Sequence, residues 1–146
     1  MASPVGTLAL RAADGAITAV EWGRVATSDA APVFDQARAE LGAYFAGDLT
    51  NFTVPLAPGG SVFQQAFYAA LCAIPYGETR SYGDLAAELG VSAQAIGQAC
   101  GANPIPILIP CHRVLGADGL GGYSGAGGVE TKVALLKLEG AASLLI

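Results

Sequence analysis

Two short helices joined by a tight turn are predicted by the stretch Ser81-Tyr-Gly-Asp-Leu-Ala-Ala-Glu-Leu-Gly-Val-Ser-Ala-Gln-Ala-Ile-Gly-Gln-Ala-Cys-Gly-Ala102. Ser81 and Asp84 occupy the positions of a capping box, and Gly90 supplies the stop for the first helix. Ser92 can cap the second helix. The arrangement resembles a helix-turn-helix, a motif that many helical proteins contain without binding DNA. The pattern therefore predicts the local fold and leaves DNA binding open.

The residues that follow these helices differ sharply in character. They read Ile105-Pro-Ile-Leu-Ile-Pro-Cys-His-Arg-Val-Leu115, an apolar run with prolines that holds the single histidine of the chain beside a cysteine. A glycine-rich loop from Gly119 to Gly128 comes next. Apolar residues at helical spacing then predict a last helix over Val129–Glu139, with Gly140 as its stop.

The N-terminal region is predicted to combine a small sheet with one helix. Two alternating apolar runs, Thr7–Leu10 and Ile17–Trp22, flank Asp14-Gly15, which is typical of a hairpin turn. Apolar residues recur at helical spacing over Val33–Ala46. The run Phe52–Leu56 predicts a third strand, at a sheet edge because it contains a proline.

A linker is predicted at Ala57-Pro-Gly-Gly60, because proline and glycine cluster there. Ser61 with Gln64 matches a further capping box, and the helical spacing that follows extends to Ala73. These boundaries divide the chain into an N-terminal α/β lobe, residues 1–59, and a C-terminal helical lobe, residues 60–146. The predicted fold class is α+β.

Composition and charge narrow the functional classes. The chain has 146 residues, 53% of them apolar and 13% charged, so it has enough apolar surface to fold as one domain or two small lobes. Seven Lys and Arg against twelve Asp and Glu give a net charge of −5, which by itself argues against a polyanionic partner. The longest apolar run, Ala66–Tyr76, is shorter than the roughly 20 residues of a membrane span. Without a visible export signal, a cytoplasmic protein is expected.

The three cysteines and the single histidine allow either a reactive thiol or an inert buried one. Cys72, Cys100 and Cys111 form no CxxC pair, and His112 alone cannot complete a zinc site with them, so no disulfide framework, metal or cofactor is expected. A nucleophilic thiol needs a neighbour that takes its proton, which His112 can do through a bridging water, and a carboxylate elsewhere should orient the imidazole. The alternative is a small buried thiol beside a satisfied core histidine.

A family resemblance is carried by three stretches of the C-terminal lobe. They are Ile74-Pro-Tyr-Gly-Glu-Thr-Arg-Ser-Tyr-Gly-Asp-Leu-Ala86, Asn103-Pro-Ile-Pro-Ile-Leu-Ile-Pro-Cys-His-Arg-Val114 and Gly122-Tyr-Ser-Gly125. Together they resemble the signature of the O6-alkylguanine-DNA alkyltransferases over Ser61 to Gly140. The N-terminal lobe is similar to the ribonuclease-H-like lobe of that family in element order and in Phe45-Ala-Gly47. The resemblance implies that the C-terminal lobe carries the family's helix-turn-helix.

The resemblance implies a monomeric, single-turnover repair protein. It would flip an O6-alkylated guanine out of double-stranded DNA and transfer the alkyl group irreversibly to Cys111. His112 would be the water-mediated base, oriented by Glu139, and Tyr82 would donate a proton to the departing guanine. The other implied substrate contacts are Asn103, which braces the turn under the active-site loop, the backbone carbonyls of Val114 and Cys111, and the base-pocket residues Tyr123 and Ser124.

The resemblance is incomplete at the residues with which the family binds DNA. The family usually places an arginine in the recognition helix to fill the gap left by the flipped base, and this chain has Gln94 there, with Ser92, Ala93 and Ala95 beside it. The stretch Tyr82–Pro110 contains no Lys or Arg, although phosphate contacts usually come from such residues. Helix N-termini and backbone amides can still hold phosphates, so weakened duplex binding is expected.

Two other functions stay open from the sequence. One is a family member that keeps the thiol chemistry but acts on free alkylated bases or as an interaction module. The other is a turnover cysteine hydrolase, which is weaker because no oxyanion donors are evident.

Overall fold

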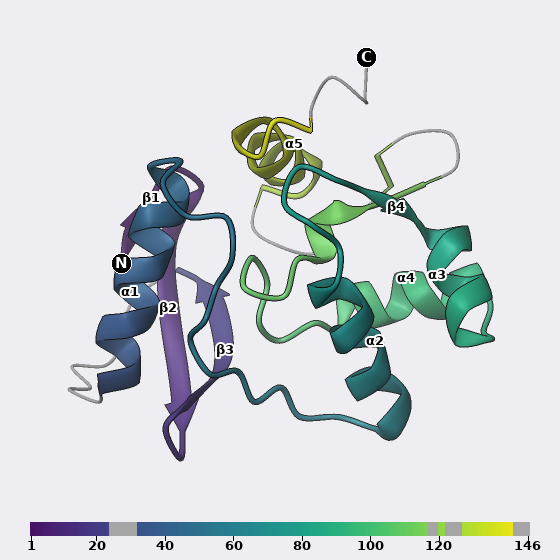
Figure 1. Cartoon of the computed structure of the whole chain (residues 1–146), viewed down its shortest axis with the longest axis horizontal. Coiled ribbons are helices and arrows are strands. Elements are labelled where there is room, and N and C mark those ends of the chain that lie inside the picture. The colour runs from purple at the N-terminus through teal and green to yellow at the C-terminus, as the bar shows by residue number, and fades with distance from the viewer. Residues whose placement is uncertain (24–31, 117–119, 122–126, 142–146) are drawn as a thin grey trace.

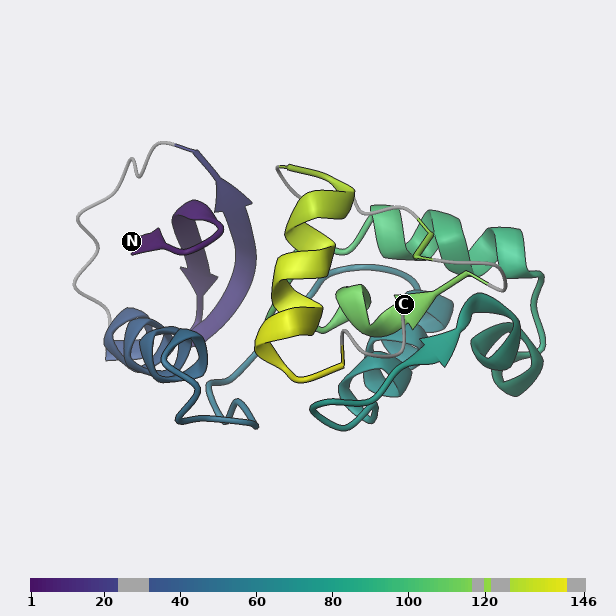
Figure 2. The same ribbon diagram turned by 90° about the horizontal axis from the view of Figure 1, so that it is seen from above.

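The structure is a computed structural model that describes residues 1–23, 32–116, 120–121 and 127–141. Two lobes lie side by side (Figures 1 and 2), and the predicted α+β class is confirmed. The N-terminal lobe holds β1 (Ala2–Ser3), β2 (Gly6–Ala13), β3 (Ala16–Trp22) and α1 (Pro32–Phe45). The C-terminal lobe holds α2 (Val62–Cys72), β4 (Arg80–Ser81), α3 (Tyr82–Leu89), α4 (Ala93–Gly101), the short 3-10 helix η1 (Cys111–Arg113), β5 (Val114–Leu115) and α5 (Val129–Leu138).

The hairpin of β2 and β3 turns where the sequence predicts it. Ala13 pairs with Ala16, which leaves Asp14-Gly15 as a two-residue turn. Both turn residues have positive φ, 50° and 79°, as a type I′ turn requires. The inward-facing side chains of the two strands are buried against α1; they are Leu8, Leu10, Ile17 and Val20.

The third strand of the sheet is not the predicted one. The strand order is β1-β2-β3, so the N-terminal β1 takes the edge position. The prediction of a strand at Phe52–Leu56 is wrong, because this segment makes an isolated bridge to Ile17 and no ladder. The backbone amides of Thr53 and Val54 donate to the Glu40 carboxylate instead, at 2.8 and 3.0 Å. The next residue, Pro55, has no N–H that could join a ladder.

Serine caps begin the helices of the C-terminal lobe, as the sequence predicts. Ser61 and Ser81 form complete capping boxes at α2 and α3, and the Ser92 hydroxyl caps α4. Gly90 ends α3 with a φ of 69°, a conformation that favours glycine. The two helices α3 and α4 pack on each other as the predicted helix-turn-helix. Across the described ranges, no helix is long and apolar enough to cross a membrane.

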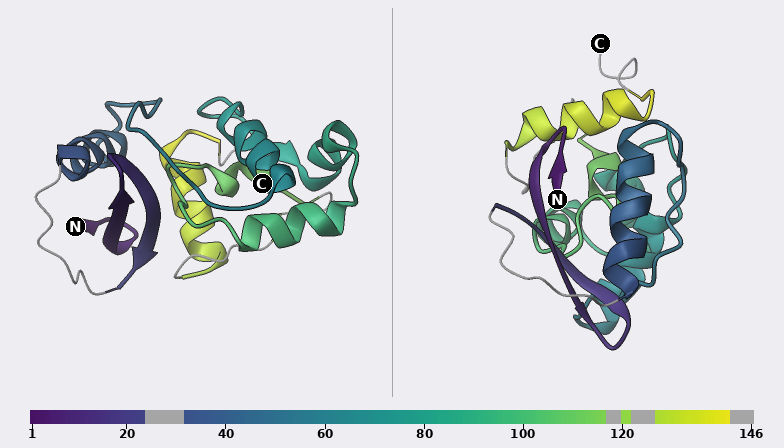
Figure 3. Two further views of the ribbon diagram at one scale, coloured as in Figure 1. Left: turned by 90° about the horizontal axis from the view of Figure 1, so that it is seen from below. Right: turned by 90° about the vertical axis from the view of Figure 1, so that its left-hand side faces the viewer.

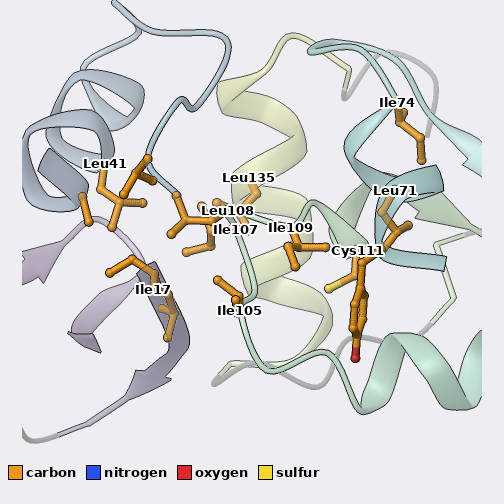
Figure 4. Close-up of a cluster of buried hydrophobic side chains, with 14 of the residues drawn as sticks. Ile17, Leu41, Leu71, Ile74, Ile105, Ile107, Leu108, Ile109, Cys111 and Leu135 are labelled. Atoms are coloured by element: carbon orange, nitrogen blue, oxygen red, sulfur yellow. The ribbon is translucent and has the colours of Figure 1, made fainter. Parts of the chain in front are cut away.

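The apolar run after α4 lies along the seam between the lobes. Its residues Ile105, Ile107, Leu108 and Ile109 are each at most 3% exposed. Figure 4 shows them between Ile17 and Leu41 of the N-terminal lobe on one side and Leu71 and Ile74 on the other. A backbone hydrogen bond of 2.9 Å, from Val20 N to Pro104 O, also joins the lobes here. Figure 3 shows α5 between the sheet and the other helices of the C-terminal lobe.

A short parallel pairing places the start of α3 next to the segment that follows η1. In it, Arg80 pairs with Val114 and Ser81 with Leu115, so β4 and β5 run side by side. Tyr82, the first residue of α3, is therefore held close to the backbone that follows Cys111.

Candidate active site

The turn before Cys111 is held by one buried amide side chain. Asn103 is 9% exposed; its Nδ2 donates to Ile109 O and its Oδ1 accepts the amide of Ile105, both at 3.0 Å. Between these two bonds, Ile107 adopts a φ of 72°, a left-handed conformation that costs a β-branched residue about 1–3 kcal/mol. The side chain of Asn103 and the apolar seam together hold this loop in its strained conformation.

Cys111 is a buried thiol at the first position of η1. It is 4% exposed, and its amide donates to Ile109 O at 2.8 Å. Burial raises the pKa of the thiol, while a hydrogen bond with the Asn103 side chain and the charge of Lys132 act in the opposite direction. Cys111 is therefore protonated at neutral pH, and nucleophilic attack requires a base that removes its proton.

The imidazole of His112 is held in one orientation by Glu139. Its side chain is fully buried, and Nε2 lies 2.7 Å from Oε2 of Glu139. The proton of the neutral ring therefore sits on Nε2, and Nδ1 carries the lone pair. Within the described ranges, Nδ1 is the one buried side-chain nitrogen or oxygen without a hydrogen-bond partner. Burial lowers the pKa of His112, so the ring is neutral at pH 7 and can accept a proton.

The carboxylate of Glu139 forms hydrogen bonds with three side chains, those of His112, Arg113 and Tyr44. This residue caps the C-terminus of α5 and its side chain is fully buried. Arg113 donates to it twice, from Nε to Oε1 at 2.8 Å and from Nη2 to Oε2 at 3.0 Å, and the Tyr44 hydroxyl donates to Oε2 at 2.6 Å. Burial opposes ionisation, but hydrogen bonds from His112 and Arg113 lower the pKa of Glu139 to about 2. The carboxylate is charged at neutral pH and is fixed by three partners.

A buried lysine connects Tyr82 with the backbone beyond η1. Lys132 has no exposed surface; its Nζ donates to Val114 O at 2.6 Å and to a second backbone carbonyl. The same Nζ lies 5.8 Å from the centre of the Tyr82 ring, within cation–π range. At Gly121, where φ is 70°, a Cβ would lie 2.7 Å from the Tyr82 ring, so the close approach of this backbone requires glycine.

Three of these groups were missed by sequence reasoning. Arg113 directly follows His112, and Lys132 shares the buried face of α5 with Leu135 and Leu136, a position where a cation signals an internal partner. Tyr44 gives no local signal, because it lies 95 residues from the carboxylate that it contacts.

The predicted DNA-facing residues lie at the start of α4. Ser92, Ala93 and Gln94 are exposed, and Ala95 is half-buried. The Ser92 hydroxyl accepts the amide of Ala95 at 3.1 Å, so it is engaged as a helix cap. This end of the helix presents an uncharged surface.

The cation that precedes the helix-turn-helix in sequence is paired with α3. Arg80 Nη1 lies 2.8 Å from Oε1 of Glu88, and its Nη2 lies 3.5 Å from Asp84 O. Much of its charge is therefore neutralised within the protein.

Two predicted pocket residues, Tyr123 and Ser124, lie outside the described residues. In the part of the chain that the structure describes, no cluster of His, Cys, Asp and Glu could hold a metal ion.

Two protein-family profiles match nearly the whole chain. Residues 1–58 match the 6-O-methylguanine DNA methyltransferase, ribonuclease-like domain, and residues 62–141 match the 6-O-methylguanine DNA methyltransferase, DNA binding domain. The chain is similar to the methylated-DNA–protein-cysteine methyltransferases of two mycobacteria. It is 46% identical to the protein of Mycolicibacterium paratuberculosis, covering 94% of this chain and 88% of that protein, and 44% identical to that of Mycobacterium leprae, covering 95% and 89%.

Solved structures agree with these sequence relationships. The crystal structure of Mycobacterium tuberculosis O6-methylguanine methyltransferase is 42% identical, covers 97% of this chain and 91% of that chain, and has a TM-score of 0.84. A crystal structure of Mycobacterium tuberculosis OGT in complex with DNA is 45% identical over the same shares of the two chains, with a TM-score of 0.85.

Proposed function

The chain belongs to the 6-O-methylguanine DNA methyltransferase family, and from this we propose that it repairs DNA by moving the alkyl group of an O6-alkylated guanine irreversibly to Cys111. The observation that carries the assignment of residues is the buried pair of His112 Nε2 and Glu139 Oε2, 2.7 Å apart, directly after the buried thiol. This pair leaves the basic nitrogen of the ring for the proton of Cys111.

In the reaction, the sulfur of Cys111 attacks the alkyl carbon and the bond from that carbon to guanine O6 breaks. His112 Nδ1 takes the thiol proton through a bridging water, and the charged Glu139 stabilises the imidazolium that forms. The product is a thioether, which none of these groups can hydrolyse. Each protein molecule therefore acts once.

Protonation of the departing guanine is the role of Tyr82. Lys132 and the backbone of Gly121 both lie close to its ring, and its hydroxyl would donate to N3 of the purine. The backbone carbonyls of Cys111 and Val114 would accept hydrogen bonds from the exocyclic amine of the guanine. Val114 O already accepts Lys132 Nζ at 2.6 Å and has a second lone pair for this purpose.

The remaining substrate contacts come from two loops. Asn103 keeps the turn under the reacting sulfur in place through its two backbone hydrogen bonds. Tyr123 and Ser124 would line the pocket that receives the flipped base.

Double-stranded DNA would be held mainly by the first turn of α4. Gln94 would occupy the space of the flipped base, and Ser92, Ala93 and Ala95 would face the groove around it. No Lys or Arg occurs between Tyr82 and Pro110, so the affinity for duplex is expected to be low and to depend weakly on salt.

We place the boundary between the lobes at residues 59 and 60, in the linker between the two matched profiles. We also propose that the protein acts as a monomer in the cytoplasm. The free thiols of Cys72, Cys100 and Cys111 suit a reducing compartment.

The test is the mass of the intact protein after incubation with a duplex that carries one O6-methylguanine, with free O6-benzylguanine in parallel and an unmodified duplex as control. We expect a gain of one CH2 group with the methylated duplex, a gain of one benzyl group with the free base, and no change with the control. A gain with the free base alone would contradict DNA repair and favour action on free bases. No gain with either would remove the support for thiol alkylation.

A further inference from the structure

The hydroxyl of Tyr44 reaches from the N-terminal lobe into the hydrogen-bond network of the candidate active site. It donates to Oε2 of Glu139 at 2.6 Å, and His112 Nε2 lies 2.7 Å from the same oxygen. Tyr44 is near the end of α1, whereas Glu139 ends α5, so this hydrogen bond joins the ends of two helices from different lobes. The N-terminal lobe therefore supplies one of the three partners of this carboxylate.

The position of the hydroxyl is fixed by the packing of its ring. Tyr44 has no exposed surface, and its ring centre lies 5.2 Å from those of Phe45 and Phe52 and 6.2 Å from that of Tyr76. Three aromatic neighbours leave the side chain little rotational freedom. The hydroxyl is thus aimed at the carboxylate by the core of the lobe.

Whether the Tyr44 hydroxyl favours or disfavours protonation of His112 follows from the Glu139 oxygen, Oε2, that both residues contact. A donor to Oε2 spreads the negative charge of Glu139 and competes with the His112 N–H for the same lone pairs. The other charged groups around this pair are Arg113 on η1, which contacts the carboxylate, and Lys132 on α5, both of which disfavour a protonated imidazole. Cys111, whose thiol is protonated, precedes His112, and the ring of Tyr76 packs edge-on against that of Tyr44. Removal of the Tyr44 hydroxyl would leave the carboxylate more able to stabilise an imidazolium.

We infer that Tyr44 is a positioning residue of the N-terminal lobe: it fixes the Glu139 carboxylate and limits how strongly this carboxylate holds a protonated His112. In the proposed alkyl transfer, on which this role rests, His112 must be neutral before it accepts the thiol proton. Tyr44 keeps it neutral at lower pH than the pair with Glu139 alone would. The lobe that does not carry the helix-turn-helix thereby contributes to the base.

The chain offers a matched control in Tyr76. Its hydroxyl donates to Leu138 O at 3.1 Å, so it also bonds to the end of α5, but to a backbone carbonyl. Tyr76→Phe and Tyr44→Phe each remove one hydroxyl from the same aromatic group and keep both rings. Loss of packing between α5 and its surroundings would affect both variants, whereas a change at the carboxylate would affect Tyr44→Phe alone.

The experiment is an NMR titration of the imidazole signals, which are unambiguous because His112 is the single histidine of the chain. We expect the titration midpoint of Tyr44→Phe to lie about half a pH unit above that of wild type, or about threefold in proton affinity, and that of Tyr76→Phe to match wild type. Coincident imidazole signals for wild type and Tyr44→Phe throughout the folded range would overturn the inference. An equal displacement in both variants would also overturn it, because it would show a general structural effect.

The same three proteins show whether the effect reaches the reaction. We expect the acidic limb of the alkyl-transfer rate, measured with free O6-benzylguanine, to move to higher pH in Tyr44→Phe only. If wild type transfers no alkyl group from free O6-benzylguanine or from the methylated duplex, the proposed function fails while the titration still tests the contact. If wild type reacts and the limb of Tyr44→Phe does not move, the inference fails and the proposed function stands.

Discussion

The seam around Cys111 and the outer face of the helix-turn-helix use polar groups in opposite ways. At the seam, Arg113, Lys132 and Glu139 are almost completely buried and each has defined partners. On the outer face, the start of α4 is exposed and uncharged, and the nearby Arg80 is half-buried in a pair with Glu88. One region concentrates charge where water is excluded, and the other lacks charge where phosphates would bind.

From this difference we expect alkyl transfer and DNA binding to depend on separate parts of the chain. The seam draws its groups from α1, η1 and α5, so a change in one group leaves another buried polar atom without a partner. The face of α4 is local and exposed, and its side chains can change at little cost to stability. We expect substitutions to affect the two regions very differently.

Removal of the Cys111 sulfur should have the greatest effect on alkyl transfer and none on DNA binding. Cys111→Ala should abolish the mass gain with a methylated duplex completely, because the attacking sulfur is gone, and should leave the affinity for duplex unchanged. Cys100→Ala is the matched control and should react as wild type does. Intact-protein mass and fluorescence anisotropy measure the two properties. Transfer that persists in Cys111→Ala would assign the acceptor to another residue.

The next effect compares a buried with an exposed ion pair. Glu139→Gln should lower the free energy of unfolding by about 3–5 kcal/mol, because it leaves Arg113 buried without a counter-charge. It should also slow alkyl transfer by about 100-fold or more, because the imidazolium loses its stabilising carboxylate.

Glu88→Gln is the control for this comparison. Its partner Arg80 is 34% exposed and Glu88 is 48% exposed, so the loss should be about 1 kcal/mol or less. Urea unfolding of the two variants measures both values. Equal losses would mean that the seam does not depend on its charges as described.

Acid should weaken the seam before it affects the outer face. The pKa of His112 is lowered from 6.5 in the folded protein, so stability is complete above about pH 6.5 and falls as unfolding takes up a proton below it. The pKa of Glu139 is lowered from 4.5 to about 2, which adds a second loss below pH 4.5 of about 3 kcal/mol when complete. Urea midpoints between pH 8 and pH 2 test both losses, with His112→Gln expected to lack the first loss. Stability that rises toward pH 5 would contradict the sign.

The parts of the fold that local residues specify were predictable from the sequence. Asp14-Gly15 predicted the hairpin turn, and Ser61, Ser81 and Ser92 predicted three helix starts, because turns and caps are set within a few residues. The prediction of a strand at 52–56 was wrong because the carboxylate of Glu40, which is distant in sequence, accepts hydrogen bonds from backbone amides of this segment.

The residues of the candidate site also divide into those that the sequence pointed to and those that it did not. The family resemblance pointed to Cys111, His112 and Glu139, and these three lie together in the structure. Tyr44 could not be found from local patterns, because only the tertiary fold brings it near the carboxylate that it contacts. Lys132 carries a local signal on the apolar face of α5, but its carbonyl partners could not be predicted from the sequence.

The decisive measurement for the separation of alkyl transfer from DNA binding is the rate of single-turnover alkyl transfer from a methylated duplex, measured over a range of DNA concentrations for wild type and Gln94→Arg. The arginine should lower the half-saturating DNA concentration by about three- to tenfold and steepen its salt dependence by about one counterion, while the plateau rate stays the same. Ala39→Arg adds the same charge to the exposed face of α1 and should leave both unchanged. A plateau rate that changes in Gln94→Arg while half-saturation does not would contradict the separation of the two regions.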